Sequence, residues 1–337
     1  MINQVTLGNT GLRVSDRCMG TMTFGNEADE SMSKKLYARC RETGINFFDC
    51  ANVYAGGESE SILGRLIAAE RSQVVITSKC FFKFGEGPLD QGCSRAAIIY
   101  QVEQSLKRLN TDYIDLYFMH HFDAHTPLED QLLALDDLVR QGKIRYPAVS
   151  NYAAWQVEKA LGISARLGLN GLRCIQPMYS LLKRQAEVEL LPMAEAEGLG
   201  VISYSPLGGG VLTGKYGSGS EGAEGRLKAN DMYARRYSGT TDFEVAQDFC
   251  ALAQELGCHP VALAVAWVAW HPAITAPIIG ARNLDQLEPA LQSAEVEMDA
   301  ELYQRIEALT QKPPMANDRE EERAFQGGLP TQLGAKK

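Results

Sequence analysis

Four residues that lie far apart in the sequence carry side chains that together suit the protonation of an oxygen atom: Asp49, Tyr54, Lys79 and His120. A tyrosine with an ordinary pKa near ~10 is a poor acid at neutral pH, so we expect Lys79 to lower the pKa of Tyr54 by favouring the phenolate. Asp49 would orient and compensate the Lys79 ammonium. A neutral His120 could hold a carbonyl oxygen beside the Tyr54 hydroxyl. This set predicts proton donation to an oxygen while another group attacks the carbon.

Each of these residues has a simpler interpretation when it is taken alone. Asp49 would cap a helix, Lys79 would be a solvated surface residue, and His120 would be a hydrogen-bonded core residue. A metal site made of His120, His121 and His125 is disfavoured, because consecutive strand residues point to opposite faces. No nucleophile with a paired base competes with the acid–base interpretation, which depends on the four residues acting together.

The elements that must position these residues form a repeating pattern. Apolar, strand-like runs lie near residues 18, 46, 74, 114, 144, 173, 201 and 277, and segments of helical periodicity separate most of them. Strands that alternate with helices indicate a parallel sheet, and eight is the number of strands in a closed α/β barrel. We therefore predict an α/β fold, a (β/α)8 TIM barrel, in which Asp49, Lys79 and His120 end strands at the carboxyl face and Tyr54 lies on the loop after Asp49.

Other elements are predicted around this repeat. Alternation over 5–14, around Asn9-Thr10-Gly11, predicts an N-terminal β-hairpin. A Gly/Ser-rich loop over about 208–241 and a polar C-terminal tail over about 311–337 are expected at the substrate mouth of a single domain that covers 1–337. Helices are predicted over 30–43, 59–69, 94–109, 127–141, 153–168, 185–197, 242–256, 260–270, 283–291 and 299–311.

Composition restricts the class of protein. With 45% hydrophobic and 22% charged residues, the chain has the composition of a soluble globular protein. A net charge of −9 argues against nucleic acid as a partner, because phosphate backbones bind clustered cations.

The eight cysteines form no Cys-x-x-Cys pair, and we interpret them as reduced thiols. With no signal core and no apolar run near ~18 residues, we expect a cytoplasmic protein without a membrane segment.

Two glycine-rich stretches resemble nucleotide-binding motifs by their letters only. The stretch 217–222 matches a dinucleotide fingerprint, but it follows no predicted strand. The stretch 209–215 approaches a P-loop but continues into Tyr216, where Ser or Thr would hold magnesium. Backbone amides of the second stretch, together with Lys215, would still suit a phosphate group.

Several motifs in this order and spacing resemble the aldo-keto reductase superfamily, up to about residue 310. They are Phe48-Asp49-Cys50-Ala51 with Tyr54, Gly57-Glu58-Ser59-Glu60 with Leu63-Gly64, Thr77-Ser78-Lys79, Tyr113-Ile114-Asp115-Leu116-Tyr117 before His120, Val149-Ser150-Asn151, Tyr204-Ser205-Pro206-Leu207 and Ile279-Gly280-Ala281-Arg282.

The resemblance implies a barrel that binds NADPH or NADP, with NADH as the alternative, and no Rossmann domain. Asp49, Tyr54, Lys79 and His120 fall on the catalytic tetrad of the superfamily, with Tyr54 as the proton donor.

The same likeness implies how the cofactor would be held. Ser150, Asn151 and Gln176 would bind the nicotinamide carboxamide, Tyr204 would stack on the ring, 205–215 would cover the pyrophosphate, and Arg282 with Gln286 would meet the adenosine. The full implied set is Gly20, Thr21, Met22, Asp49, Ser150, Asn151, Gln176, Tyr204, Ser205, Pro206, Leu207, Gly208, Gly210, Lys215, Gly280, Arg282 and Gln286.

The sequence also departs from the superfamily pattern. Pro289-Ala290 replaces an acid or amide followed by Asn, which alters the adenine contacts and weakens the inference of NADPH over NADH. Cys50 and Ala148 replace a usual Thr and Gly, and we interpret both as packing changes. His121 and Pro177-Met178 also differ, and His121 is expected to face outward.

Three hypotheses for function follow. The first is an NAD(P)H-dependent reductase of aldehydes or ketones, with a small-molecule carbonyl as its partner. The second is a cofactor-binding regulatory or accessory subunit of the same fold with little turnover. The third is a metal-dependent barrel hydrolase, which would lose activity with a chelator and bind no nicotinamide. The pattern does not specify the physiological substrate or the oligomeric state.

Overall fold

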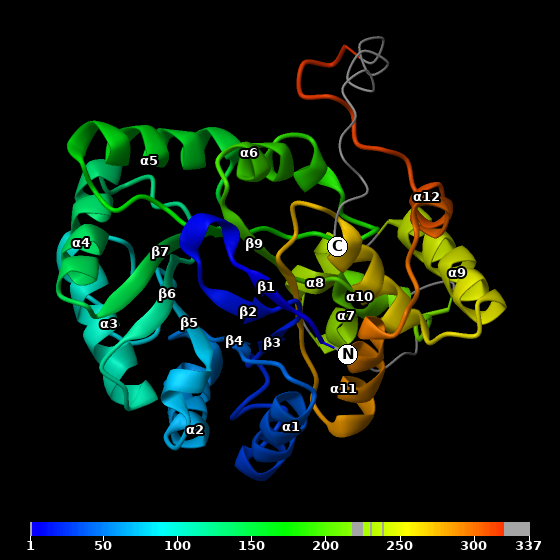
Figure 1. Cartoon of the computed structure of the whole chain (residues 1–337), viewed down its shortest axis with the longest axis horizontal. Coiled ribbons are helices and arrows are strands. Elements are labelled where there is room, and N and C mark those ends of the chain that lie inside the picture. Colours follow the sequence, from blue (N-terminus) through cyan, green and yellow to red (C-terminus); the bar gives the residue numbers. More distant parts are fainter. Residues whose placement is uncertain (1, 218–224, 230, 238, 320–337) are drawn as a thin grey trace.

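Eight parallel strands form a closed barrel in the computed structural model, which describes residues 2–217, 225–229, 231–237 and 239–319 (Figure 1). Neighbouring strands follow the order β10-β3-β4-β5-β6-β7-β8-β9. The predicted (β/α)8 TIM barrel is therefore confirmed. The strands are β3 (Cys18–Gly20), β4 (Phe47–Asp49), β5 (Val75–Cys80), β6 (Ile114–Met119), β7 (Ile144–Ser150), β8 (Cys174–Gln176), β9 (Gly200–Ser203) and β10 (Ala276–Ile279).

Helices surround the barrel as an outer layer, and most of them present an apolar stripe to the strands or to a neighbouring helix, whereas α10 is apolar on all sides. Within this layer α9 and α12 pack on α10, which is buried along most of its length. The helices are α1 (Glu30–Glu42), α2 (Glu58–Ile67), α3 (Arg95–Leu109), α4 (Leu128–Arg140), α5 (Ala154–Leu167), α6 (Leu190–Ala196), α9 (Thr240–Glu255), α10 (Pro260–Trp270), α11 (Leu284–Leu291) and α12 (Ala300–Glu307).

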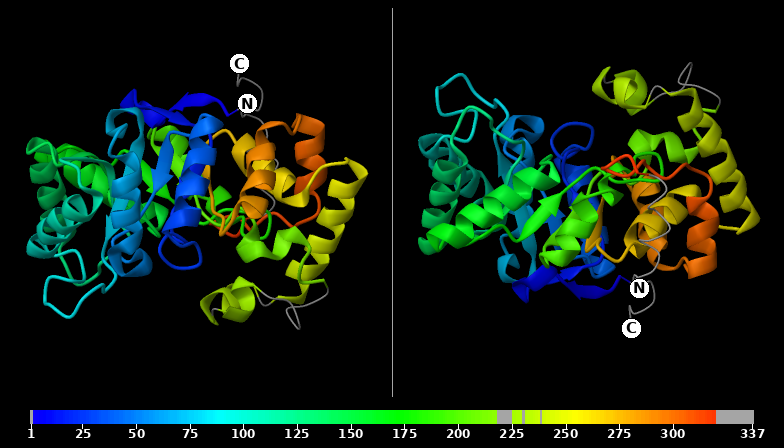
Figure 2. Two further views of the ribbon diagram at one scale, coloured as in Figure 1. Left: turned by 90° about the horizontal axis from the view of Figure 1, so that it is seen from below. Right: turned by 90° about the horizontal axis from the view of Figure 1, so that it is seen from above.

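The predicted N-terminal hairpin closes one end of the barrel. β1 (Gln4–Thr6) pairs antiparallel with β2 (Arg13–Ser15), and a 3-10 turn over Gly8–Thr10 joins them. Leu7 and Val14 are fully buried and join the apolar cluster inside the strands. Figure 2 shows the hairpin at one end of the barrel and α8 (Asp231–Arg236) at the opposite end. The hairpin therefore closes the amino ends of the strands, where the N–H of Ser15 donates to Asn46 Oδ1 just before β4.

The helix predicted over 185–197 is broken in the structure. A 3-10 turn over Gln185–Glu187 precedes α6, and Glu189 between them has the non-helical angles φ −136 and ψ −41. The cause is Pro192, whose ring would clash with the carbonyl of the residue four positions before it in a continuous helix. Pro192 is tolerated in the first turn of α6, where backbone N–H groups lack helical partners anyway.

The segment predicted as a loop over 208–241 contains helical turns in its described part, so that prediction is wrong there. A 3-10 segment covers Gly208–Thr213, and α7 (Arg226–Ala229) precedes α8. Glycines with positive φ interrupt the apolar spacing by which a helix is recognised in a sequence. The turns are nevertheless packed against the core, because Leu212 and Tyr237 are fully buried. Residues 218–224, 230 and 238, and 320–337 of the predicted tail, lie outside the described residues.

Among the helices of the described residues, no single one combines the length and apolar character needed to cross a membrane. One pair, Thr241–Glu255 with Pro260–Trp270, reaches that length and composition only when taken together, across a bend of 99°.

Candidate active site

The four reactive residues predicted from the sequence meet at the carboxyl end of the barrel strands. Asp49 ends β4, Lys79 is the second-last residue of β5, and His120 follows β6 directly. Tyr54 begins a 3-10 turn five residues after Asp49. Parallel pairing of β4, β5 and β6 aligns these strand ends, which is how distant positions in the sequence reach one site.

A buried ion pair lies at the centre of this group. The Lys79 Nζ donates to both carboxylate oxygens of Asp49, each at 2.7 Å, and to the carbonyl oxygen of Cys50 at 2.7 Å. The same ammonium lies 3.3 Å from the Tyr54 hydroxyl oxygen. Because the Lys79 side chain is 0% exposed and that of Asp49 is 4% exposed, water does not screen these contacts.

The electrostatics of Tyr54 differ from the prediction. Burial raises the pKa of Tyr54 well above its ordinary value, and the Lys79 ammonium lowers this pKa only in part. Lys79 is already compensated by Asp49, whose negative charge itself raises the pKa of Tyr54. The prediction that Lys79 lowers the pKa of Tyr54 overall is therefore wrong for this state, and the phenol keeps its proton at neutral pH.

Lys79 keeps its charge in spite of its burial. Burial lowers the pKa of Lys79, but attraction to Asp49 and to Tyr54 outweighs this effect and raises the pKa above its ordinary value. An ammonium held between a carboxylate and a phenol can stabilise negative charge that develops on the phenol oxygen. The arrangement is therefore suited to a tyrosine that gives up a proton during a reaction.

His120 is a neutral imidazole beside the phenol. Burial, with added repulsion from Lys79 and His121, holds the pKa of His120 well below its usual range. Its ring lies edge-on to Tyr54 at a centroid distance of 6.1 Å. The buried Nδ1 of His120 has no hydrogen-bond partner within the described part of the chain. A neutral imidazole carries one ring N–H, which can donate a hydrogen bond to the oxygen of a small molecule.

The residue next to it, His121, is exposed and stacks on Phe81 at 5.2 Å, while its Nδ1 lies 3.0 Å from the carbonyl oxygen of Phe122. Across residues 2–217, 225–229, 231–237 and 239–319, no group of three His, Cys, Asp or Glu side chains is placed to hold a metal ion.

Two further side chains hold Asp49 in place. The amide Nε2 of Gln176, at the end of β8, donates to Asp49 Oδ1 at 2.8 Å. The Thr77 hydroxyl donates to the same oxygen at 2.8 Å. Gln176 was predicted to bind a carboxamide, whereas Thr77 was not singled out in the sequence, although its position two residues before Lys79 places it on the same face of β5.

Predicted cofactor residues at the ends of β7, β8 and β9 form a hydrogen-bonded chain. The Tyr204 hydroxyl donates to Asn151 Oδ1 at 2.7 Å, and Asn151 Nδ2 donates to the carbonyl oxygen of His120 at 2.9 Å and lies 3.1 Å from Ser150 Oγ. Ser150 in turn donates to the carbonyl oxygen of Gln176 at 2.9 Å. These groups therefore border the four reactive residues along one side of the barrel mouth.

The glycine-rich segment after β9 adopts a backbone that few other residues tolerate. Gly208, Gly209 and Gly210 have φ values of 56°, 66° and 95°, and Ser205 has a φ of 59°. A Cβ added at Gly210 would lie 3.3 Å from the Lys215 Nζ, so this ammonium sits over the glycine backbone. Backbone turns of this kind beside a cation suit a phosphate group. Pro206 and Leu207 connect Ser205 to this segment.

The remaining predicted cofactor residues lie on the other side of the mouth, where β10 pairs with β3. The Thr21 hydroxyl donates to the carbonyl oxygen of Asp49 at 3.0 Å. Arg282 is exposed, and its backbone N–H donates to the Gln286 Oε1 at 3.1 Å. The residues of this group are Gly20, Thr21, Met22, Gly280, Arg282 and Gln286.

An exposed aromatic residue beside the tetrad was missed in the sequence. Phe82 lies edge-on to His120 at 4.9 Å and is 39% exposed. The available signal was the pair Phe81-Phe82 shortly after Lys79, because residues that follow barrel strands line the active-site face.

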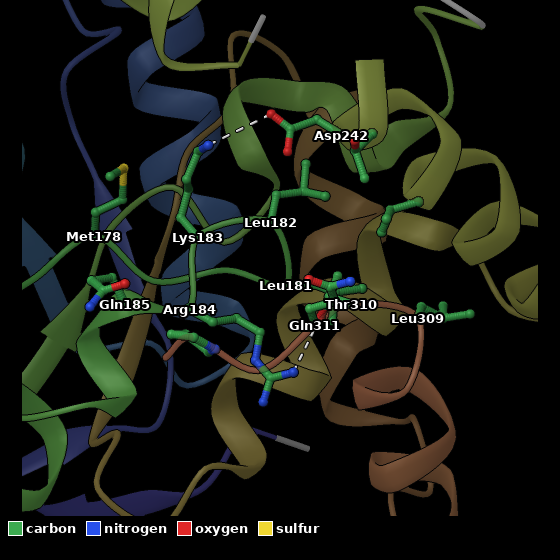
Figure 3. A pocket seen from close by; sticks show the side chains of 13 residues that line it. Met178, Leu181, Leu182, Lys183, Arg184, Gln185, Asp242, Leu309, Thr310 and Gln311 are labelled. Carbon is green, nitrogen blue, oxygen red and sulfur yellow. Dashed lines mark hydrogen bonds and ion pairs between the residues drawn. The ribbon is translucent and has the colours of Figure 1, made fainter. Parts of the chain in front are cut away.

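A hollow of about 660 Å³ lies between the segment after β8, α9 and the segment after α12, and Figure 3 shows Lys183 and Asp242 at one edge and Arg184 at another. None of Asp49, Tyr54, Lys79 and His120 lines this hollow. Met178, which does line it, forms a β-bridge with Tyr204. The hollow therefore adjoins the predicted nicotinamide side of the mouth, and the reactive oxygen of Tyr54 is elsewhere.

Comparison with known proteins adds an independent finding. The model of a family described as the Aldo/keto reductase family matches residues 18–311. An uncharacterized oxidoreductase, YrpG, of Bacillus subtilis (strain 168) is 39% identical over 311 residues, which cover 89% of this chain and 93% of that protein. A probable voltage-gated potassium channel subunit beta of Oryza sativa subsp. japonica is 37% identical over 317 residues, or 91% of this chain and 96% of its own length. Its counterpart in Arabidopsis thaliana is 37% identical over 298 residues, with 86% and 90% covered.

Proposed function

Because the chain belongs to the aldo/keto reductase family, we propose that it is an NADPH-dependent oxidoreductase that reduces aldehydes or ketones to alcohols. One observation carries the proposal: the protonated Tyr54 hydroxyl lies 3.3 Å from a buried ammonium that Asp49 holds in place. This is the arrangement that a general acid needs, because the donor keeps its proton until a nearby cation can stabilise the anion that remains.

The residues at the barrel mouth fit a nicotinamide dinucleotide. The positive φ values of Gly208 to Gly210 and the ammonium of Lys215 above them support a pyrophosphate site. Ser150, Asn151 and Gln176 offer amide and hydroxyl groups for a carboxamide, and the Tyr204 ring offers a flat face. When bound, the cofactor supplies a hydride to the carbonyl carbon.

The proposed chemistry of the protein itself is proton transfer and orientation. Tyr54 donates its hydroxyl proton to the carbonyl oxygen, and the Lys79 ammonium stabilises the phenolate that forms. Asp49 keeps Lys79 charged and fixed. Neutral His120 orients the carbonyl oxygen by donating a hydrogen bond from its ring N–H.

The preference for NADPH over NADH depends on cations at the adenosine end. Arg282 is exposed beside Gln286, and its guanidinium is available for a forked contact with a 2′-phosphate. Pro289 and Ala290 lie on α11 next to this position and offer no polar side chain to the adenine. We propose that Arg282 carries most of the discrimination between the two cofactors.

A second candidate function is a cofactor-binding accessory subunit with little turnover. It is favoured by the relatives from Oryza sativa and Arabidopsis thaliana, whose names describe them as probable potassium channel beta subunits. Sustained turnover separates the two functions, since an accessory subunit of this kind would bind the cofactor without steady reduction.

The test is a fluorescence titration with NADPH and NADH, followed by steady-state assays with aldehydes, ketones and sugars. We expect tight NADPH binding and turnover of at least one carbonyl class. Tyr54→Phe should bind NADPH as the wild type does, while kcat falls by about 10²- to 10⁴-fold, the usual contribution of a general acid. Unchanged turnover in this variant would remove the role of Tyr54, and tight binding without turnover in the wild type would favour the accessory subunit.

A further inference from the structure

One buried amide outside the reactive group joins the two loops that frame it. Gln101 lies on α3 and is 0% exposed. Its Oε1 accepts a hydrogen bond from Asn52 Nδ2 at 3.0 Å and another from the backbone N–H of Phe81 at 3.3 Å. Its Nε2 donates to the carbonyl oxygen of Gly92 at 3.2 Å. A single side chain therefore contacts the loop after β4 and both ends of the loop after β5.

The first of these loops presents the phenol. Asn52 is fully buried and precedes Tyr54 by two residues. The backbone N–H of Asn52 donates to the carbonyl oxygen of Lys79 at 3.4 Å, and that of Tyr54 donates to the carbonyl oxygen of Ala51 at 3.1 Å. Within the described residues, the Asn52 side chain forms its hydrogen bond to Gln101 through Nδ2, and its Oδ1 has no partner there. The bond to Gln101 therefore fixes this side chain.

The second loop places an aromatic wall against the imidazole. Phe81 has a φ of 127°, a strained value for a residue with a side chain, and its carbonyl oxygen accepts from the backbone N–H of Gly92 at 2.7 Å. Such a backbone persists only where its surroundings fix it, and here Gln101 fixes the N–H of Phe81 and the carbonyl of Gly92. The next residue, Phe82, contacts the edge of His120.

We propose that Gln101 is a positioning residue for carbonyl reduction, which sets the Tyr54 loop and the Phe81–Gly92 loop at a fixed distance from each other. The inference rests on the proposed reductase function. Gln101 acts through Asn52 on the phenol and through Phe81 and Phe82 on the imidazole. It touches neither the reacting atoms nor the residues proposed to hold the cofactor.

The main test is Gln101→Met, which keeps the length of the side chain and removes all three hydrogen bonds. We expect kcat to fall about 10- to 100-fold, because small displacements of reacting groups have effects of this size. The dissociation constant for NADPH, measured by fluorescence, should stay within about twofold of the wild type, because the proposed cofactor contacts come from other strand ends.

Gln131→Met is the matched control. Gln131 lies on α4 and is also 0% exposed, and its Nε2 donates to the carbonyl oxygens of Asp123 at 3.2 Å and Thr126 at 2.8 Å. This variant removes a buried amide that holds the loop after β6, in which Asp123 also bonds the N–H of Cys93, but it leaves the bonds of Gln101 to Asn52, Phe81 and Gly92 in place. We therefore expect a comparable loss of thermal stability with a smaller effect on kcat, within about threefold of the wild type. Equal losses of kcat in the two variants, or a wild-type kcat in Gln101→Met, would overturn the proposal.

Gln101→Glu provides a readout that general destabilisation would not move. A fully buried carboxyl favours its protonated form, which accepts from Asn52 and Phe81 and donates to Gly92 as the amide does. As the pH rises and the carboxyl ionises, the donation to Gly92 is lost. We expect kcat of this variant, relative to the wild type, to be highest at low pH and to fall as the pH rises. A ratio that does not change with pH would contradict the inference.

Asn52→Ala covers the case in which Gln101→Met fails to fold, because it removes only the bond to the Tyr54 loop. Asn52→Ala should lower kcat without weakening NADPH binding, and an unchanged kcat would again overturn the proposal. The wild-type assay separates the two levels of inference. Without wild-type turnover the reductase function and this inference both fail, whereas turnover that Asn52 and Gln101 do not affect removes the inference alone.

Discussion

Two buried cation–carboxylate clusters in this barrel differ in how completely their polar atoms are used. Arg184, which is 4% exposed, belongs to the segment that follows β8. Its Nε and Nη2 each donate to the Glu187 carboxylate at 2.8 Å, and Nη2 also contacts the Glu307 carboxylate. Its Nη1 donates to the carbonyl oxygen of Glu307 at 3.2 Å and to the Thr310 hydroxyl at 3.1 Å. Every guanidinium nitrogen has a partner, and the cluster joins the chain after β8 to the end of α12.

The Lys79 cluster at the barrel mouth is incomplete in comparison. Lys79 and Asp49 satisfy each other, but the Tyr54 hydroxyl accepts from Lys79 and keeps its own proton, and the His120 Nδ1 has no described partner. The Tyr54 hydroxyl can still donate its proton, and the neutral His120 ring carries an N–H, so both can hydrogen-bond to a ligand beside the charged pair. The comparison suggests that a saturated buried cluster stabilises the fold, whereas an unsaturated one carries the chemistry.

The largest effect that would test this contrast is expected for Lys79→Met. The variant leaves the Asp49 carboxylate buried without its cation and removes the charge that stabilises the Tyr54 phenolate, so we expect kcat to fall by about 10³-fold or more. Steady-state reduction of the best carbonyl substrate measures the loss. Lys183→Met is the control, because Lys183 is partly exposed and lies 3.6 Å from Asp242, outside the reactive group. A kcat of Lys79→Met within tenfold of the wild-type value would contradict the proposed difference between the two clusters.

The saturated cluster should give the opposite result. Arg184→Met leaves Glu187 without its cation and Glu307 with Lys312 alone, at 3.4 Å. Breaking a fully buried ion pair typically lowers the free energy of unfolding by about 3–5 kcal/mol, and we expect a loss towards the lower end of this range because both carboxylates are partly exposed. We expect this loss in urea denaturation, with kcat at low temperature within about threefold of the wild type. A large drop in kcat with an unchanged unfolding midpoint would show that this cluster also serves the reaction.

The sequence was sufficient to predict features that depend on local pattern. Asp49, Lys79 and His120 each end an apolar run, and parallel pairing then aligns those ends, so the site followed from the fold. The pKa of Tyr54 could not be predicted, because it depends on burial and on how fully Asp49 compensates Lys79.

Contacts between distant segments could not be predicted from the sequence either. Gln101 lies 49 positions from Asn52 and has the apolar neighbours of an ordinary helix face, so nothing in its surroundings shows that it joins two loops. The turns within 208–241 were missed because glycines interrupt the spacing that identifies a helix.

The smallest effect concerns the pH dependence of stability, and it also separates the two clusters. The pKa of His120 is held well below 6.5, mainly by burial, so the unfolded chain binds a proton at this residue at a higher pH than the folded chain. The stabilisation is fully present above about pH 6.5, and it is lost as the pH falls through 6.5 towards the folded pKa, by at most about 1.4 kcal/mol per pH unit. Arg184 stays charged throughout this range. Urea denaturation at pH 5 to 8 should therefore show that the free energy of unfolding falls more steeply towards acid pH in the wild type and in Arg184→Met than in His120→Gln. Parallel curves for all three proteins would mean that folded His120 titrates like an exposed histidine.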